Sequence, residues 1–147
     1  MTSTNSDQAL PPLVPAIEAV TETLIGEMVA FGASHYPVGD PNLDVNYFRW
    51  LCLQNPAGIA QAVIIRVEGK LVGQAIMVPV DLAHADGSVH GYFVVSVLTH
   101  PQYRNRRLFS TIIDAASTFV SGRAGWLLGH PNAAALPGWT RKQMTFR

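Results

Sequence analysis

Apolar residues recur at intervals of three or four in two segments of the chain, and this spacing predicts two amphipathic helices. The first runs over residues 18–31 and is stopped by Gly32. The second runs over residues 108–120, where one wide apolar stripe precedes Gly122 and Gly125. Between them, "VNYFRWLCLQNP" indicates a shorter helix that Asp44 caps and Pro56 ends.

The middle of the chain has the pattern of β-strands. Two strands flank the turn at residues 68–70, and a second turn at residues 85–87 leads to a third strand. That third strand is apolar at nearly every position from Tyr92 to Leu98, which predicts a central strand covered on both faces. "LVPAI" near the start predicts a short edge strand, residues 126–130 a further strand, and "AAALPGWTRKQ" a weak helix. The final "MTFR" has the pattern of another strand beginning.

The length of 147 residues fits one domain. We expect a disordered lead over residues 1–12 and a single domain over residues 13–147. The single cysteine, Cys52, excludes an intrachain disulfide and fits a reducing compartment. No apolar run has the length of a membrane helix, and the start lacks the layout of a signal peptide. We therefore expect a cytoplasmic protein without a membrane partner. No His, Cys or Asp pair has metal-ligand spacing, so no metal is expected.

Charge is distributed unevenly along a chain whose formal net charge is zero. Residues 1–100 carry three basic and nine acidic side chains, whereas residues 101–147 carry seven basic ones and a single acid, Asp114. Arg104, Arg106 and Arg107 lie where a strand passes into the helix over 108–120. Free backbone N–H groups and the positive end of the helix dipole also gather at such a junction. The sequence therefore predicts an anion site, with phosphate as the expected occupant.

The segment "THPQYRNRRLFSTIID" resembles the acetyl-CoA-binding motif of the GNAT superfamily of N-acetyltransferases. The segments "YFRWLCLQNPAG", "KLVGQAIMVPV" and "GHPNAAALPGWTRKQM" resemble other segments of one GNAT branch. The resemblance covers roughly residues 45–147. It implies an α+β (α/β) fold with a bent mixed β-sheet and flanking helices. The family's usual last two strands would follow the point where "MTFR" ends, so we expect them to be lacking.

The resemblance also implies where acetyl-CoA would bind, between the fourth strand (91–99) and the fifth (126–130). Backbone groups of Leu98 and Thr99 would face the pantetheine and the thioester, and Asn132 would lie near the pantetheine arm. The pyrophosphate would be held by the amides of residues 104–109, which are Arg104, Asn105, Arg106, Arg107, Leu108 and Phe109.

This loop departs from the family pattern. Asn105 and Arg107 stand where the family has glycines, which permit positive φ and close approach of the backbone to phosphate. Phe109 replaces a small residue. These changes predict a looser or partly blocked cradle, for which the arginine charges compensate in part.

Acyl transfer to an amine needs a base for the ammonium proton and an acid for the leaving thiolate. Ser96 stands where GNAT enzymes often place an acid, and the family's usual tyrosine has no counterpart, Trp139 being the nearest aromatic residue. His100 and His130 are the titratable groups at hand, since histidine works near neutral pH. The catalytic candidates are therefore His100, Ser96 and His130.

The sequence is compatible with three functions. The first is an N-acetyltransferase that passes an acetyl or other acyl group from acyl-CoA to a small amine or a peptide amine by direct attack. The second is a non-catalytic GNAT-like module that binds CoA or another protein, which the altered loop and the missing acid favour. Nucleic-acid binding is third, because the arginines cluster at one helix start and no nucleic-acid motif is present. The sheet edge expected after the last strand predicts a homo-oligomer, with a dimer as its simplest form.

Overall fold

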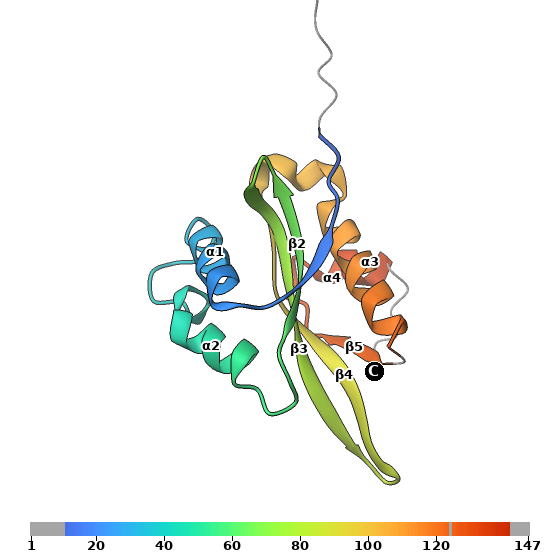
Figure 1. Ribbon diagram of the computed structural model, residues 1–147. Helices are drawn as coiled ribbons and strands as arrows, with labels where there is room; N and C mark the ends of the chain where they lie inside the picture. Colours follow the sequence, from blue (N-terminus) through green and yellow to red (C-terminus); the bar gives the residue numbers. More distant parts are fainter. Residues whose placement is uncertain (1–10, 124, 142–147) are drawn as a thin grey trace, which may run out of the picture.

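The computed structural model describes residues 11–123 and 125–141. Its centre is a five-stranded sheet in the order β1-β2-β3-β4-β5, in which the first four strands are antiparallel and β5 is parallel to β4 (Figure 1). The bounds of the strands are Ala16–Ala19 (β1), Gln61–Val67 (β2), Lys70–His84 (β3), Gly87–Thr99 (β4) and Trp126–Gly129 (β5).

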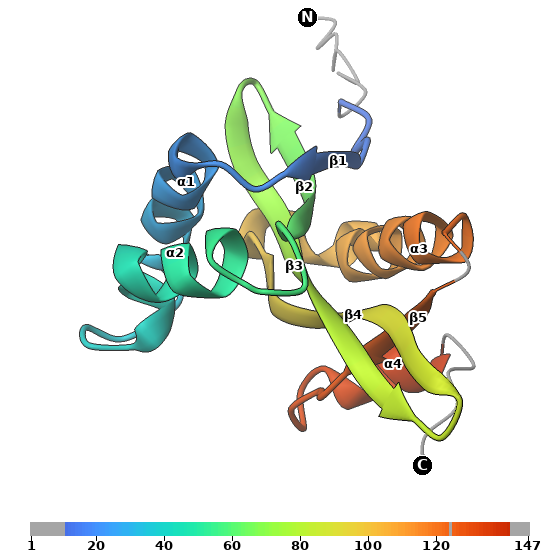
Figure 2. The ribbon, with the colours of Figure 1, turned by 60° about the horizontal axis from the view of Figure 1, so that its bottom comes forward.

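Helices cover both faces of the sheet, which gives the molecule two cores. On one face lie α1 (Glu22–Gly32), the 3-10 turn η1 (Pro41–Leu43) and α2 (Val45–Leu53). On the other lie α3 (Leu108–Ser121) and α4 (Leu136–Arg141), with the 3-10 segment η2 (Pro101–Arg106) leading into α3 (Figures 1 and 2). The described helices include none that is long and apolar enough to cross a membrane.

The two helices of the first face begin where side-chain caps are available. Thr21 Oγ1 accepts from the Leu24 amide at 3.1 Å, and Asp44 Oδ1 accepts from the Asn46 amide at 2.8 Å. Asp44 was the predicted cap, and the predicted stop at Gly32 is also confirmed. The predicted start of α1 at residue 18 is wrong, because residues 16–19 pair with β2 as an edge strand before Thr21 can cap the helix.

The strand buried on both faces is β3, and not β4 as predicted. Residues 71–79 of β3 are all buried, whereas residues 95–99 of β4 are only half-buried. The reason lies in the neighbouring strands: β2 pairs with residues 70–77 of β3 and β4 with residues 73–84, while β5 accompanies β4 over four residues only. The apolar run in β4 therefore lines an opening in the sheet.

Helix α3 lies close to the sheet because β3 carries a glycine beneath it. A Cβ atom on Gly73 would lie 3.1 Å from Ile112 Cδ1 and 3.3 Å from Leu108 Cγ. Leu108, Ile112 and Ile113 are fully buried in this contact. The anchoring of the first turn of α3 at Leu108 fixes the helix start against the sheet, where the sequence predicted an anion site.

The ends of the chain bear on two predictions. Most of the predicted lead, residues 1–10, and the predicted strand start at residues 144–147 lie outside the described residues. Within the described part, α4 is the last element, and the expectation that further strands are lacking stays a prediction. The β3–β4 hairpin projects beyond the body of the protein, and residues 81–90 are exposed (Figure 1).

Candidate active site

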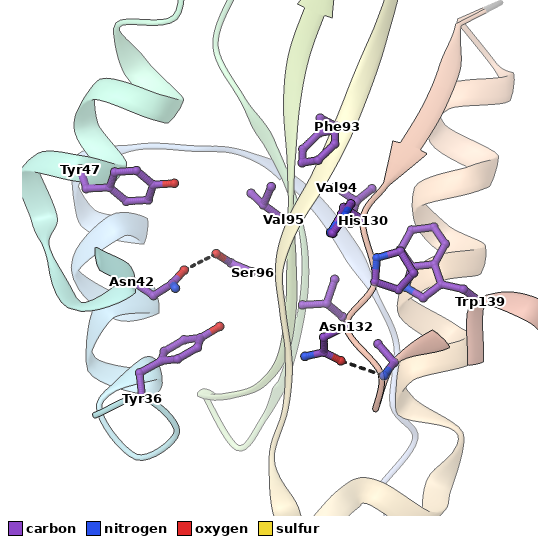
Figure 3. A pocket seen from close by; sticks show the side chains of 13 residues that line it. Tyr36, Asn42, Tyr47, Phe93, Val94, Val95, Ser96, His130, Asn132 and Trp139 are labelled. Atoms are coloured by element: carbon purple, nitrogen blue, oxygen red, sulfur yellow. Dashed lines mark hydrogen bonds between the residues drawn. The ribbon is translucent and has the colours of Figure 1, made fainter. Parts of the chain in front are cut away.

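Strands β4 and β5 run side by side and then separate. They pair only over Gly91–Val94 and Trp126–Gly129, and β4 continues for five more residues without β5. A cavity of about 340 Å³ lies at this separation and is lined from both sides (Figure 3). Its described lining comprises Tyr36, Asn42, Tyr47, Phe93, Val94, Val95, Ser96, Val97, His130, Pro131, Asn132, Ala135 and Trp139.

Ser96 lies at the bend of β4 that opens this cavity. The register between β3 and β4 shifts after Gln74, which leaves an extra residue on β4, and Ser96 takes a left-handed backbone conformation with φ of 51°. Such a bulge bends its strand and redirects a side chain. Gln74 is buried and its Nε2 donates to the Ser96 carbonyl at 3.2 Å, which helps to hold the bulge.

One wall of the cavity comes from the segment between α1 and α2. Ser96 Oγ donates to Asn42 Oδ1 at 2.7 Å, and Tyr36 and Tyr47 point toward β4 from the same side (Figure 3). Asp40 Oδ1 accepts from the amide and from the Nδ2 of Asn42, both at 2.8 Å, which fixes the asparagine. Burial raises the pKa of the Tyr36 hydroxyl, and the nearby Asp40 carboxylate adds to the rise.

The opposite wall comes from the end of β5 and the start of α4. His130 and Asn132 follow β5 directly, and Asn132 Oδ1 accepts from the Ala135 amide at 2.9 Å (Figure 3). Trp139 is buried behind them and lies against Gly129, where a Cβ atom would come within 2.5 Å of its ring. The sequence predicted His130 and Asn132 for this site, and the structure brings both to the same cavity as Ser96.

The junction of η2 and α3 has the backbone that the anion-site prediction requires. Arg107 adopts the left-handed conformation, with φ of 55° and ψ of 30°, and serves as the N-cap of α3. It makes no side-chain capping hydrogen bond, and the first turn of α3 carries no acid. Asn105 differs from the expectation, because it lies within the 3-10 segment and has no positive φ. Only one of the two positions where the family has glycine thus needs the left-handed conformation.

The three arginines of the junction do not act alike. Arg104 and Arg107 are exposed, and neither side chain has a hydrogen-bond or ion-pair partner among the described residues. Arg106 is engaged within the protein: its Nη2 donates to the Pro11 carbonyl at 2.8 Å, and its guanidinium lies 5.6 Å from the centre of the Tyr103 ring. The role of Arg106 at phosphate stays a prediction, and its bond to Pro11 leaves it fewer free donors than Arg104 and Arg107 have.

The backbone groups of Thr99 and Leu98 point in opposite directions in the plane of the sheet. The His100 amide donates to the Val72 carbonyl at 2.7 Å, so the alternation of an antiparallel ladder turns Leu98 toward β3 and Thr99 away from it. The Thr99 carbonyl then meets His35 Nε2 at 3.2 Å. Of this predicted pair, Thr99 alone has its backbone toward the side on which acetyl-CoA was expected.

Three other predicted residues have positions that restrict what they can do. His100 lies on the α1 side, where its ring stacks on Phe31 at 6.5 Å, and it does not line the cavity that holds Ser96 and His130. The side chain of Leu108 is fully buried, so only its backbone is available to a ligand. Phe109 packs against Gly138 and edge-on against Trp139 at 6.3 Å, and thereby supports the wall of the cavity.

Cys52 is fully buried, and burial raises the pKa of its thiol to about 11, so it is not a ready nucleophile. No group of three or more His, Cys, Asp or Glu side chains that could hold a metal ion is found in the described ranges.

Tyr36 and Asn42 were missed by the sequence analysis. Both lie in the loop "HYPVGDPNLD", whose composition indicates only a loop, and nothing in its spacing shows that it folds against β4. Tyr47, on α2, also lines the cavity. Of its aromatic neighbours on the same helix, Phe48 is core and Trp50 is exposed.

Comparison with known proteins agrees with this architecture. The chain is similar to a predicted acetyltransferase from Clostridium acetobutylicum, solved with acetyl-CoA (12% identity, 91% of this chain and 92% of that chain, TM-score 0.69). It is also similar to glucosamine-6-phosphate N-acetyltransferase from Arabidopsis thaliana (8% identity, 91% of this chain and 93% of that chain, TM-score 0.67). A third similar structure is the ribosomal-protein-alanine N-acetyltransferase of Brucella melitensis biovar Abortus 2308 (22% identity, 91% of this chain and 92% of that chain, TM-score 0.62). At these identities the likeness concerns the fold.

A search of curated proteins found no match. The profile of the family described as "Acetyltransferase (GNAT) domain" matches residues 18–127, which is more than half of the chain. This range includes the bulged strand β4, the η2–α3 junction and most of the sheet. The chain therefore belongs to the GNAT acetyltransferase family.

Proposed function

We propose that the protein is an acetyl-CoA-dependent N-acetyltransferase in which an amine attacks the thioester directly. The observation that carries this proposal is the coincidence of two features along one strand. The cavity at the β4–β5 separation holds polar groups from both walls, and β4 then leads through η2 to a helix start without a side-chain cap. A thioester and a pyrophosphate belong to one molecule, and this arrangement offers a place for each.

The residues at the helix start fit a pyrophosphate. The left-handed conformation of Arg107 opens the first turn of α3, where amide N–H groups and the helix dipole favour an anion. Arg104 and Arg107 add exposed positive charge, and the Thr99 backbone and Asn132 would hold the pantetheine arm. Acetyl-CoA would supply the activated acyl group. Arg106 is left out of this assignment because of its bond to Pro11.

In the proposed reaction, the amine nitrogen forms a bond to the carbonyl carbon and the bond from that carbon to sulfur breaks. The amine loses a proton, and the departing thiolate gains one. Ser96 gives its hydrogen to Asn42, so its oxygen keeps lone pairs that can accept a hydrogen bond from the amine. His130 is exposed at the opposite wall and can exchange protons between the cavity and water. We assign amine positioning to Ser96 and proton transfer to His130, and drop His100.

A CoA-binding module without catalysis is the second candidate. One observation favours it: none of the described residues that line the cavity is a carboxylate, which leaves His130 as the one titratable base among them. The module would bind acetyl-CoA and leave the thioester intact when amines are added.

Calorimetric titration with acetyl-CoA, followed by measurement of thiol release with a mixed set of amines, separates the two candidates. We expect binding and amine-dependent thiol release. His130→Ala should reduce kcat by roughly 100-fold or more, as for loss of a general base, with the affinity for acetyl-CoA unchanged. His84→Ala, on the exposed hairpin, is the matched control and should leave kcat within twofold. Binding without thiol release would favour the module, and the absence of binding would refute both.

Two further features belong to this proposal. The outer edge of β5 pairs with no other strand among the described residues, and Leu128 on it is 47% exposed. An open edge of this kind favours pairing with another chain, so we propose a homodimer, which sedimentation at micromolar concentration would reveal. The buried free thiol of Cys52 and the use of acetyl-CoA fit the cytoplasm as the place of action.

A further inference from the structure

The charge of the cavity restricts the molecules that it can accept. Its described lining carries no acidic and no basic side chain other than His130. The Asp40 carboxylate, which is outside the lining, contacts Asn42 and already accepts two hydrogen bonds from it. Among the described lining residues, a phosphorylated acceptor would find no guanidinium or ammonium group, and a polycation would find no carboxylate.

The wall that faces the α1–α2 segment is aromatic. Tyr36 and Tyr47 present hydroxyl groups on large rings, and Phe93 and Val95 of β4 complete an apolar floor. Because Tyr36 is neutral over the physiological range, its hydroxyl contributes a dipole and a ring face without charge. Such a wall suits a flat or apolar group that ends in one amine.

The aromatic surface continues out of the cavity along α2. The ring of Tyr47 lies 6.1 Å from the ring of Trp50, one helical turn further on. Trp50 is 60% exposed, unusual for so large an apolar side chain. With Leu51, Gln54, Asn55 and Pro56, it borders a second hollow of about 170 Å³. This surface would accommodate the body of a molecule whose reacting end lies at Ser96.

We infer that the acyl acceptor is a monoamine carried on an uncharged aromatic or apolar body, which lies along Tyr47 and Trp50. This inference rests on the proposed function, because it concerns the acceptor side of the same site. It distinguishes this chain from the glucosamine-6-phosphate N-acetyltransferase whose fold it shares, since that acceptor carries a phosphate.

The test compares four amines in a thiol-release assay with saturating acetyl-CoA: phenethylamine, ethanolamine, spermidine and glucosamine 6-phosphate. We expect kcat/KM for phenethylamine to exceed that for each of the others by at least tenfold. Ethanolamine is the matched control for the aromatic body, because it keeps the amine and a two-carbon chain. A preference for spermidine or glucosamine 6-phosphate would overturn the inference, as would equal rates with ethanolamine.

A surface variant then locates the body of the acceptor. Trp50→Ala should raise the KM for phenethylamine about five- to tenfold while kcat and the affinity for acetyl-CoA stay within twofold. Ile59→Ala removes a similarly exposed apolar side chain that lines neither hollow, and should change nothing. An unchanged KM in Trp50→Ala would contradict the placement along α2.

Binding measurements keep this inference separable from the proposed function. Calorimetry with acetyl-CoA tests the cofactor side, and calorimetry with phenethylamine tests the acceptor side. If acetyl-CoA fails to bind, the proposed function is refuted. Phenethylamine binding that Trp50→Ala weakens would then still support the acceptor surface. If acetyl-CoA binds and phenethylamine neither binds nor reacts, the acceptor inference is wrong and the proposed function stands.

Discussion

Replacing Arg107 by glycine should stabilise the protein, although the substitution removes a charged side chain. Arg107 has φ of 55° and ψ of 30°, a conformation that costs a residue with a Cβ atom about 1–2 kcal/mol. Glycine avoids this cost but brings a larger loss of backbone entropy on folding, about 0.5–1 kcal/mol. The exposed guanidinium has no hydrogen-bond or ion-pair partner in the described ranges, so its loss adds little. The difference is a gain of at most about 1.5 kcal/mol, and of about 0.75 kcal/mol when the midpoints are taken.

The gain can be measured as a shift in thermal unfolding. For a domain of this size, 1 kcal/mol corresponds to a change in Tm of about 2–4 °C, so we expect Arg107→Gly to raise Tm by about 1–4 °C. Arg104→Gly is the matched control, because Arg104 is also exposed but lies in η2 without a positive φ. It should lower Tm by a similar amount. A Tm for Arg107→Gly that falls as far as that of Arg104→Gly would refute the strain argument.

Three further outcomes are expected. Arg104→Ala should weaken acetyl-CoA at least tenfold by calorimetry with Tm nearly unchanged, because a charge-assisted phosphate contact is worth about 1.5–3 kcal/mol; unchanged affinity would remove Arg104 from the site. Burial raises the pKa of Cys52 from 9.0 to about 11, so stability is full below the unfolded-state pKa of 9.0 and is lost as pH rises toward 11. Urea unfolding should show a loss of about 2–3 kcal/mol over that window that is absent in Cys52→Ala, and parallel pH profiles would contradict it. Gly129→Ala should displace Trp139 and lower kcat/KM. Gly26→Ala, whose Cβ meets nothing within 4 Å, should raise Tm and leave kcat/KM unchanged. An equal change of kcat/KM in both variants would argue against the packed wall.

The parts of the fold that the sequence predicts well depend on local chemistry. The helix over residues 108–120 is confirmed, because its apolar stripe is long and Leu108 and Ile112 meet the sheet. The turn at residues 68–70 and the cap at Asp44 are likewise local features. The strand at residues 16–19 was predicted in part as helix, since only its pairing with β2 shows that these residues are extended.

The candidate site was predictable on one side only. Ser96, His130 and Asn132 lie beside motifs that resemble those of the family, and the cavity brings them together. Tyr36 and Asn42 line the cavity because the loop between α1 and α2 folds against β4. The spacing of residues in the sequence does not predict how that loop folds. His100 is adjacent to the motif but faces the α1 side, because its amide is held by β3 and its ring by Phe31. Proximity along the chain was in that case a poor guide to position in space.

The most direct test of the proposed site is to follow backbone amide resonances while acetyl-CoA is added to the ¹⁵N-labelled protein. We expect the largest shifts at residues 107–110, at the start of α3, together with shifts at Thr99 and Asn132 along the β4–β5 opening. The amides of the projecting hairpin, residues 81–90, should not move and serve as the internal control. Saturable shifts confined to other parts of the molecule, or no shifts at millimolar acetyl-CoA, would contradict the account.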